Sequence, residues 1–205
     1  YIPYIGFPPN LPIENPLSHS GWLRGFLLYT WVMAHPEQRD YFNKIKALHP
    51  QFFTGVSVIE IGSLNINGTV RDFFDATSYL GVDVSSGPGV DLVMEGQNVK
   101  LPKHSFDIAV SAECFEHNPH WKATFKNMAR LAKTAVLFTC ASDGRAEHGT
   151  TRTTPQDSPF TLEWDYYQNL NESDFRAAFD LDSMFQQYEF EYNPQSHDLY
   201  FYGLK

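Results

Sequence analysis

The sequence predicts an α/β protein built on a doubly wound, mostly parallel sheet. Between residues 56 and 140, short β-branched segments alternate with segments of helical spacing, which is typical of a parallel sheet covered on both faces. The chain then ends in two aromatic segments joined by a polar loop, which predicts a C-terminal antiparallel hairpin. These segments predict a Rossmann-like sheet of seven strands, preceded by an N-terminal helical cap.

The composition limits the classes of function. The chain has 205 residues, with 15 Lys and Arg against 24 Asp and Glu and a net charge of −9. This balance, without a basic run, disfavours nucleic acid and membrane surfaces as partners. No apolar run approaches the roughly 20 residues of a membrane span, there is no signal-peptide pattern, and two cysteines fit a reducing compartment. We therefore expect a cytoplasmic protein, monomeric or homodimeric.

Residues 1–53 are expected to form an arm and a helical cap. Prolines and aromatics alternate irregularly over residues 1–16, which predicts an extended arm. Apolar residues then recur at three- and four-residue steps up to Leu48, which predicts two helices separated near Pro36 and ended by His49 and Pro50. An aromatic stripe of this kind is most often core packing.

Residues 54–205 are expected to form one compact domain. Its predicted strands are Val56–Ile61, Tyr79–Val84, Val90–Met94, Phe106–Ala112, Ala135–Cys140, Phe185–Tyr192 and Leu199–Gly203. Its predicted helices are Gly68–Thr77, Asn118–Ala132 and a helix after Asn171 that ends near Phe179. The segment between Asp83 and Asp91 is too short for a helix. Right-handed crossovers bring the carboxyl ends of the parallel strands to one edge, where ligands usually bind.

The turn after the first predicted strand is the sharpest local signal. Glu60-Ile-Gly62 ends the strand, and the chain continues through Ser63 and Asn67 toward a predicted helix. A glycine here lets the backbone approach a ligand, and a following helix would offer free N–H groups. Asp83 ends the next strand, where an acid can accept both hydroxyls of a ribose. The combination predicts a nucleotide-like cofactor.

These motifs resemble those of class I S-adenosylmethionine-dependent methyltransferases that act on small molecules. Glu60-x-Gly62 resembles the first motif of that family, and Asp83 resembles its ribose-binding acid. The loop Glu95-Gly96-Gln97 resembles the segment that faces the adenine, and residues 105–117 resemble the fourth-strand signature. The resemblance runs from Val56 to the end of the chain. It implies S-adenosylmethionine as cofactor, bound by Glu60, Gly62, Ser63, Asn67, Asp83, Glu95, Gly96, Gln97 and Glu113.

Methyl transfer to a hydroxyl or a protonated amine also needs a base. His117 follows the fourth predicted strand and is the first candidate, and His148 in the long loop after the fifth strand is the second. Glu113 and Glu116 flank His117 and could orient it. A histidine in such a position can also simply cap a helix or contact solvent.

The long polar loop supplies candidates for substrate binding. Arg145 and Arg152 could hold a carboxylate or phosphate, and Trp164 and Tyr167 could line an apolar wall. Solvated arginines and core aromatics are the alternatives. Asp143, His148 and Asp157 have no compact ligand spacing, so we expect no metal.

We therefore predict transfer of a methyl group from S-adenosylmethionine to an O or N nucleophile of a small molecule. Two alternatives stay open. One is an NAD(P)-dependent oxidoreductase, although only Gly62 and Gly68 stand where such enzymes carry Gly-x-Gly-x-x-Gly. The other is a catalytically inactive module that binds the cofactor or a partner.

Overall fold

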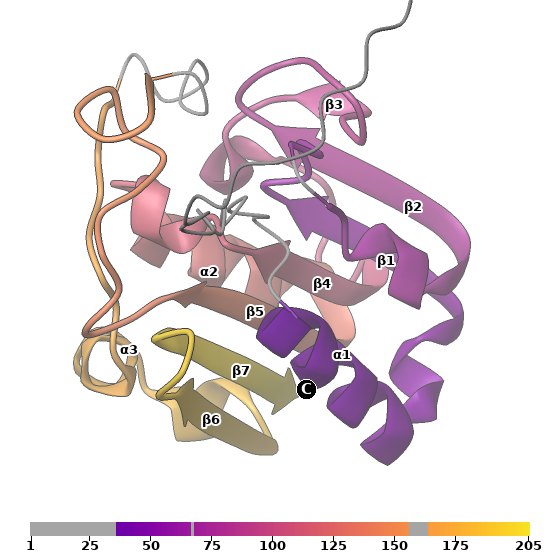
Figure 1. The fold of residues 1–205 in the computed structure, drawn as a ribbon. Coiled ribbons are helices and arrows are strands. Elements are labelled where there is room, and N and C mark those ends of the chain that lie inside the picture. The colour runs from indigo at the N-terminus through magenta and orange to yellow at the C-terminus, as the bar shows by residue number, and fades with distance from the viewer. Residues whose placement is uncertain (1–35, 67, 156–163) are drawn as a thin grey trace, which may run out of the picture. The chain divides into compact units, whose positions relative to one another are not determined.

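The structure is a computed structural model that describes residues 36–66, 68–155 and 164–205. Over these residues the chain forms a seven-stranded sheet of order β3-β2-β1-β4-β5-β7-β6 (Figure 1). The strands are β1 (Thr54–Ile61), β2 (Asp75–Asp83), β3 (Leu92–Val93), β4 (Phe106–Ala112), β5 (Ala132–Ala141), β6 (Gln187–Asn193) and β7 (Asp198–Leu204). The predicted fold class is confirmed.

Strand direction also agrees with the prediction. The strands β1 to β5 pair in parallel, whereas β7 runs antiparallel to both of its neighbours, β5 and β6. The C-terminal hairpin therefore inserts β7 beside β5 and leaves β6 at the edge of the sheet. Because β1, β2 and β4 are parallel, their carboxyl ends lie at the same edge of the sheet.

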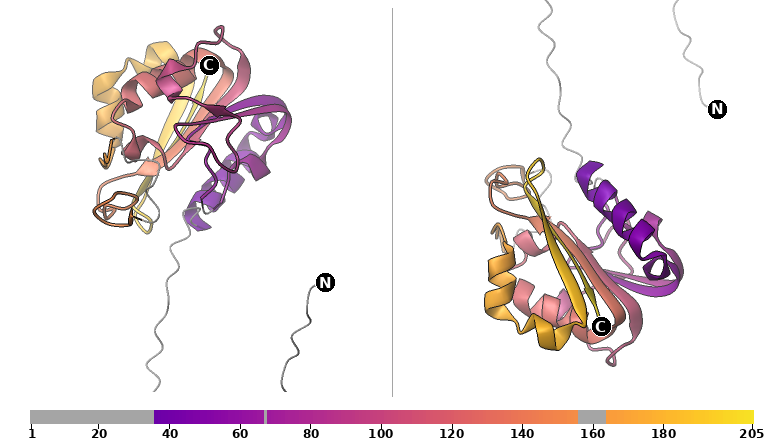
Figure 2. Two further views of the ribbon diagram at one scale, coloured as in Figure 1. Left: turned by 90° about the horizontal axis from the view of Figure 1, so that it is seen from above. Right: turned by 90° about the horizontal axis from the view of Figure 1, so that it is seen from below.

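Helices cover both faces of the sheet (Figure 2). They are α1 (Pro36–Leu48), α2 (Trp121–Leu131), α3 (Glu172–Ala178) and α4 (Leu181–Met184). Alternate residues of each central strand enter different cores: Leu137 of β5 packs on the side of α1, and Phe138 packs on the side of α2 and α3. Among the described residues, no helix has the length and hydropathy that crossing a membrane requires.

The helix predicted over Gly68–Thr77 is wrong. The chain forms only a short 3₁₀ turn at Arg71–Phe73, and β2 begins at Asp75, which pairs with Thr54 at the start of β1. The connection must therefore return along all eight residues of β1, about 26 Å. A helix over every intervening residue would reach only about 20 Å, so the connection cannot be helical throughout.

Helix α1 covers the sheet face near this connection. Phe42 stacks on Phe73 of the 3₁₀ turn at a ring distance of 5.4 Å, and Tyr41 stacks on Tyr200 of β7 at 4.5 Å. The second helix predicted in residues 1–53 is thus confirmed as α1. Its buried stripe stops before Leu48, which is 59% exposed. The predicted arm and the first predicted helix lie outside the described residues.

Candidate active site

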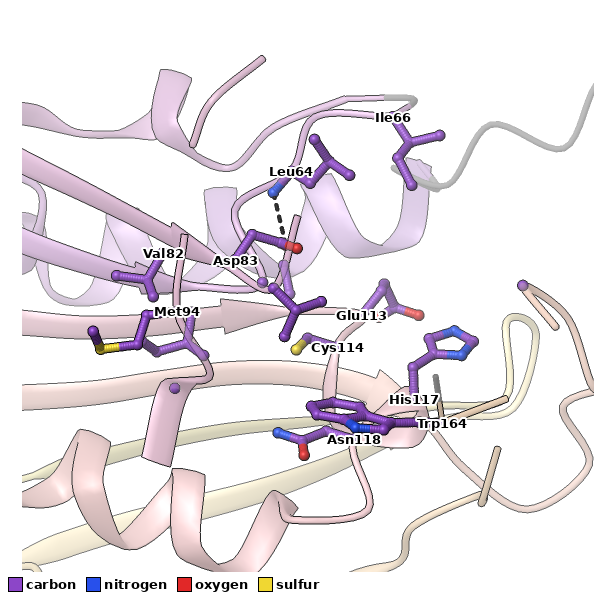
Figure 3. Close-up of a pocket in the computed structure, with 16 residues that line it drawn as sticks. Leu64, Ile66, Val82, Asp83, Met94, Glu113, Cys114, His117, Asn118 and Trp164 are labelled. Carbon is purple, nitrogen blue, oxygen red and sulfur yellow. Dashed lines mark hydrogen bonds between the residues drawn. The ribbon is translucent and has the colours of Figure 1, made fainter. Parts of the chain in front are cut away.

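A cleft of about 870 Å³, including the space open to solvent, lies at the carboxyl ends of β1, β2 and β4. Figure 3 shows the side chains that line it, with Asp83 on one wall and His117 and Trp164 on the other. The lining is mostly apolar, with two acids, one asparagine and one histidine between. This is the usual character of a small-molecule site in an open α/β sheet.

Gly62 brings the backbone of the first turn to the cleft. Its φ of +81° is the left-handed region, and an added Cβ would lie 2.5 Å from Cβ of Cys114. Its N–H donates to the Val82 carbonyl at 2.9 Å, which fixes the turn against β2. Only glycine meets both conditions, so the structure supports the backbone cradle that the sequence predicts. However, the predicted helix that would follow this turn is absent from the described residues up to β2.

Asp83 ends β2 at the wall of the cleft. Its two carboxylate oxygens accept backbone N–H groups from Leu64 and Ser85, each at 3.1 Å. Burial raises the pKa of this carboxyl above its ordinary value, while these amide bonds lower it in part. The amides hold the carboxylate in one orientation at the cleft (Figure 3).

Glu60 and Ser63 lie behind the Gly62 turn and line a smaller adjoining pocket. Glu60 is 3% exposed, and its carboxylate accepts the Tyr79 hydroxyl at 2.7 Å. Burial raises the pKa of Glu60 to about 7, and the hydrogen bond from Tyr79 opposes that shift. The Ser63 hydroxyl is buried without a hydrogen-bond partner among the described residues. A buried polar atom of this kind is available to a ligand.

Glu113 lines both the cleft and the smaller pocket. It follows β4 with a backbone φ of +48°. Residues other than glycine rarely adopt this conformation, and where they do it is often at a functional site. One carboxylate oxygen accepts the Gln38 amide at 3.4 Å, and the other has no partner in the described part of the chain. Burial, together with the charge of Glu116, raises the pKa of Glu113 well above its ordinary value.

Of the three residues predicted to bind the cofactor after β3, Glu95, Gly96 and Gln97, only Gly96 lines the cleft. Gly96 lines the cleft, and a Cβ there would lie 2.4 Å from a methyl group of Ile61. Glu95 instead accepts the side-chain amide of Gln97 at 2.6 Å, and neither residue lines the cleft. Asn67 lies outside the described residues.

Glu116, His117 and His148 come together at one end of the cleft. The rings of His117 and His148 are nearly perpendicular with centroids 5.2 Å apart, and the Tyr167 ring contacts both. Burial, followed by the charge of His148, lowers the pKa of His117 to about 3. Burial also lowers the pKa of His148 and raises that of Glu116. The imidazoles are therefore neutral near neutral pH.

The two arginines of the long loop are paired with protein carboxylates. Arg145 contacts Asp198 at 3.2 Å, in a buried ion pair. Arg152 is half exposed and contacts Glu147 and Asp165, each at 2.8 Å. Neither arginine lines the cleft. Trp164 does line it, whereas Tyr167 packs against the histidines behind its surface.

Several residues of the site were not predicted to bind a ligand. Leu64, Ile66 and Met94 form apolar walls of the cleft. Gln38 of α1 reaches the site from a distant part of the chain and donates to the Thr139 hydroxyl at 2.8 Å. Nothing in the spacing of an amphipathic helix distinguishes such a glutamine from a solvated one. The sequence does indicate that the first turn is unusual, because Leu64 and Ile66 stand where small residues are common in the resembling family and Gly68 comes late.

The fold and the cleft define a class of protein: a doubly wound α/β protein with a ligand-sized cleft at the strand ends. Residues 72–140 match the family model described as the methyltransferase domain. This stretch is therefore similar to a methyltransferase domain, which agrees with the resemblance to class I S-adenosylmethionine-dependent methyltransferases and with the enzyme class and cofactor that the resemblance implies. No curated protein matches the sequence.

Solved structures share the fold at low sequence identity. The YcgJ protein of Bacillus subtilis is 11% identical with a TM-score of 0.54, and the match covers 81% of this chain and 98% of that one. An S-adenosylmethionine-dependent methyltransferase of Thermotoga maritima is 12% identical with a TM-score of 0.50, covering 86% and 100%. Phosphoethanolamine N-methyltransferase 2 of Haemonchus contortus, solved with phosphomonomethylethanolamine and S-adenosylhomocysteine, is 15% identical with a TM-score of 0.52, covering 80% and 52%.

Proposed function

We propose that this protein transfers the methyl group of S-adenosylmethionine to an O or N nucleophile of a small molecule bound in the cleft. The observation that carries the proposal is the arrangement of the cleft, with a fixed ribose-type acid, Asp83, on one wall and the neutral His117 on the other. We propose further that it acts in the cytoplasm as a monomer or a homodimer.

The residues of the cleft fit the cofactor. Asp83 would hold the ribose hydroxyls, Gly62 would admit the ligand against its backbone, and the Ser63 hydroxyl and the second Glu113 oxygen would meet its polar amino-acid end. Gly96 and Met94 would bound the adenine. When bound, the cofactor supplies an activated methyl group on a sulfonium. The chain itself has to align the nucleophile and exclude water.

The missing helix after β1 favours this cofactor over NAD(P). Dinucleotides place a pyrophosphate on a helix N-terminus at this turn, where free N–H groups and the helix dipole stabilise its charge. The described residues between Gly62 and Asp75 form only a 3₁₀ turn, at Arg71–Phe73. S-adenosylmethionine carries no phosphate, so it does not need such a helix.

We assign the acceptor to the side of the cleft formed by His117, Trp164 and Gly149. The neighbouring Glu116 and His148 would act with His117 on the proton of the nucleophile. Arg145 and Arg152 are engaged with carboxylates of the protein, so an acceptor that depends on an anionic group has no support from them. The small size and largely apolar lining of the cleft support a small-molecule acceptor.

Calorimetry with S-adenosylmethionine, S-adenosylhomocysteine and NADH tests the cofactor site. We expect binding of the first two only, and a loss of at least about tenfold in affinity for Asp83→Ala, because two hydrogen bonds to a charged acceptor disappear. Asp75→Ala, at the exposed start of the same strand, is the control and should bind normally. Binding of NADH alone would contradict the proposal.

Transfer of a labelled methyl group to a panel of small hydroxyl and amine compounds tests catalysis. We expect at least one product, and His117→Ala should lower its rate of formation while leaving the affinity for S-adenosylhomocysteine nearly unchanged. Normal cofactor binding without any product across the panel would instead support the inactive module.

A further inference from the structure

Three side chains with metal-ligating atoms converge beside the cleft. Glu116 and His117 are neighbours in the 3₁₀ turn after β4, and His148 comes from the loop after β5. One ligand atom from each lies within 4.8 Å of the other two. The sequence shows no such set, because His148 is separated from the other two residues by α2 and β5.

Polar atoms of two of these side chains are buried without hydrogen-bond partners in the described part of the chain. Glu116 is fully buried, and neither of its carboxylate oxygens forms a hydrogen bond of normal geometry within the described part of the chain. Nδ1 of His117 is likewise buried without a hydrogen-bond partner there. Leaving a carboxylate and an imidazole nitrogen unpaired away from water is costly. A cation between them would supply the missing partner to both.

The third side chain is oriented in the way that metal-bound histidines usually are. Nδ1 of His148 lies 3.0 Å from the Ala146 carbonyl, and it must be the donor because a carbonyl only accepts. The tautomer is thereby fixed and Nε2 keeps its lone pair. The Tyr167 hydroxyl donates to the same carbonyl at 3.2 Å, and its ring packs against both histidines. The neighbouring groups therefore hold the imidazoles in place.

We infer that Glu116, His117 and His148 bind a divalent ion of the zinc class, with one coordination position open toward the cleft. Two histidines and one glutamate with a free position are the ligand set of many catalytic zinc sites. Metal–ligand distances near 2 Å place the ligand atoms of one ion about 3 to 4 Å apart. The observed atoms lie within 4.8 Å of one another, so small side-chain rotations would bring them to this spacing. His117 and Gly149 line the cleft, which puts the free position on the acceptor side.

Metal binding stands on these contacts alone, whereas the use of the free position rests on the proposed function. An acceptor hydroxyl bound there would be more acidic, because the ion stabilises its conjugate base. The hydroxyl proton would then pass to solvent water, since imidazoles bound to the ion cannot accept it, and Glu116, His117 and His148 would act on that proton through the ion they hold. This favours an oxygen nucleophile over nitrogen.

Titration of the full chain with Co²⁺, after dialysis against a chelator, tests the site. We expect one Co²⁺ per chain with the visible absorption of a four- or five-coordinate ion, displaced by Zn²⁺, and a rise in the thermal midpoint on metal binding. Glu116→Gln and His148→Ala should each weaken Co²⁺ binding by at least about 100-fold, since even the loss of a residue that only orients a ligand costs about 10- to 100-fold.

The controls separate this site from surface binding and from the proposed function. His104→Ala changes an exposed residue and Glu172→Gln a half-exposed one, both outside the cleft lining, and both variants should bind Co²⁺ like the wild type. Calorimetry with S-adenosylhomocysteine on the chelated protein reports the cofactor site separately. Normal binding of S-adenosylhomocysteine with no Co²⁺ uptake would overturn the metal site alone. Co²⁺ uptake that survives both ligand variants would also overturn it.

Discussion

At the level of single residues, Gly62 has a backbone conformation that favours glycine, and it lies at the proposed cofactor site. It combines a φ of +81° with a position where a Cβ would lie 2.5 Å from Cβ of Cys114. Gly55, near the start of the same strand, offers a comparison, because its φ is +70° but a Cβ added there would meet nothing within 4 Å. Substituting each glycine in turn therefore distinguishes the cost of backbone strain, which both positions share, from the cost of steric overlap, which arises only at Gly62.

We expect Gly55→Ala to lower the free energy of unfolding by about 1 kcal/mol, the cost of a side chain in the left-handed region. Gly62→Ala should cost a further amount of about 1 to 3 kcal/mol, because the added methyl group overlaps Cys114. It should also weaken the binding of S-adenosylhomocysteine, whereas Gly55→Ala should not. Urea denaturation and calorimetry of both variants measure these effects. Equal losses of stability and unchanged ligand affinity in the two variants would contradict this view of the turn.

The buried carboxyl of Glu60 makes stability depend on pH. Its pKa is raised by burial to about 7, from an ordinary value near 4.5. Between these values the unfolded chain loses the proton while the folded chain keeps it. The stability contributed by the protonated form is therefore complete at acid pH and is lost as the pH rises toward 7.

Glu60→Gln removes this titration and keeps an oxygen for the Tyr79 hydroxyl. We expect the variant to gain stability relative to the wild type by about 2 to 3 kcal/mol between pH 5 and pH 8. Urea denaturation of both proteins at the two pH values gives the difference. A difference that stays constant with pH would show that Glu60 ionises in the same way in the folded and unfolded chains.

At the scale of elements, α1 covers the sheet face beside the connection from β1 to β2. The described residues of that connection form no α-helix. Phe42 is fully buried against Phe73, on the same helix as the exposed Leu48. We expect Phe42→Ala to cost about 3 to 5 kcal/mol of unfolding free energy, the usual range for a buried phenylalanine. Leu48→Ala should change it by less than about 0.5 kcal/mol. Urea denaturation measures both, and similar effects of the two substitutions would contradict the packing of α1 on the sheet.

The elements also show where sequence patterns succeed and where they fail. The strand predicted at Phe106–Ala112 is β4 residue for residue, because its apolar centre, Ile108 to Val110, is buried in a central strand that is covered on both faces. Val70, Phe73 and Phe74 have helical spacing, yet they belong to a 3₁₀ turn and its flanks. Their spacing reflects burial beneath α1, and the register of β2 against β1 determines the backbone. The spacing of apolar residues in the sequence does not predict how β2 is aligned with β1.

At the scale of the whole molecule, the sheet order gathers side chains that are distant in sequence. Asp83 and Gly62 were predictable, because a strand end followed by an acid or a glycine has a local pattern. The contact of His148 with His117, and the reach of Gln38 from α1 to Thr139, depend on how loops and helices cross the sheet edge. The same assembly places Phe125 of α2, Phe175 of α3 and Phe201 of β7 in one buried core.

We propose that the cleft at the ends of β1, β2 and β4 binds S-adenosylmethionine for methyl transfer. The most direct test is a crystal structure of the protein grown with S-adenosylhomocysteine. We predict the ligand in this cleft, with its ribose hydroxyls on the Asp83 carboxylate and its sulfur on the side of His117. A ligand bound elsewhere, or with its ribose away from Asp83, would contradict the account.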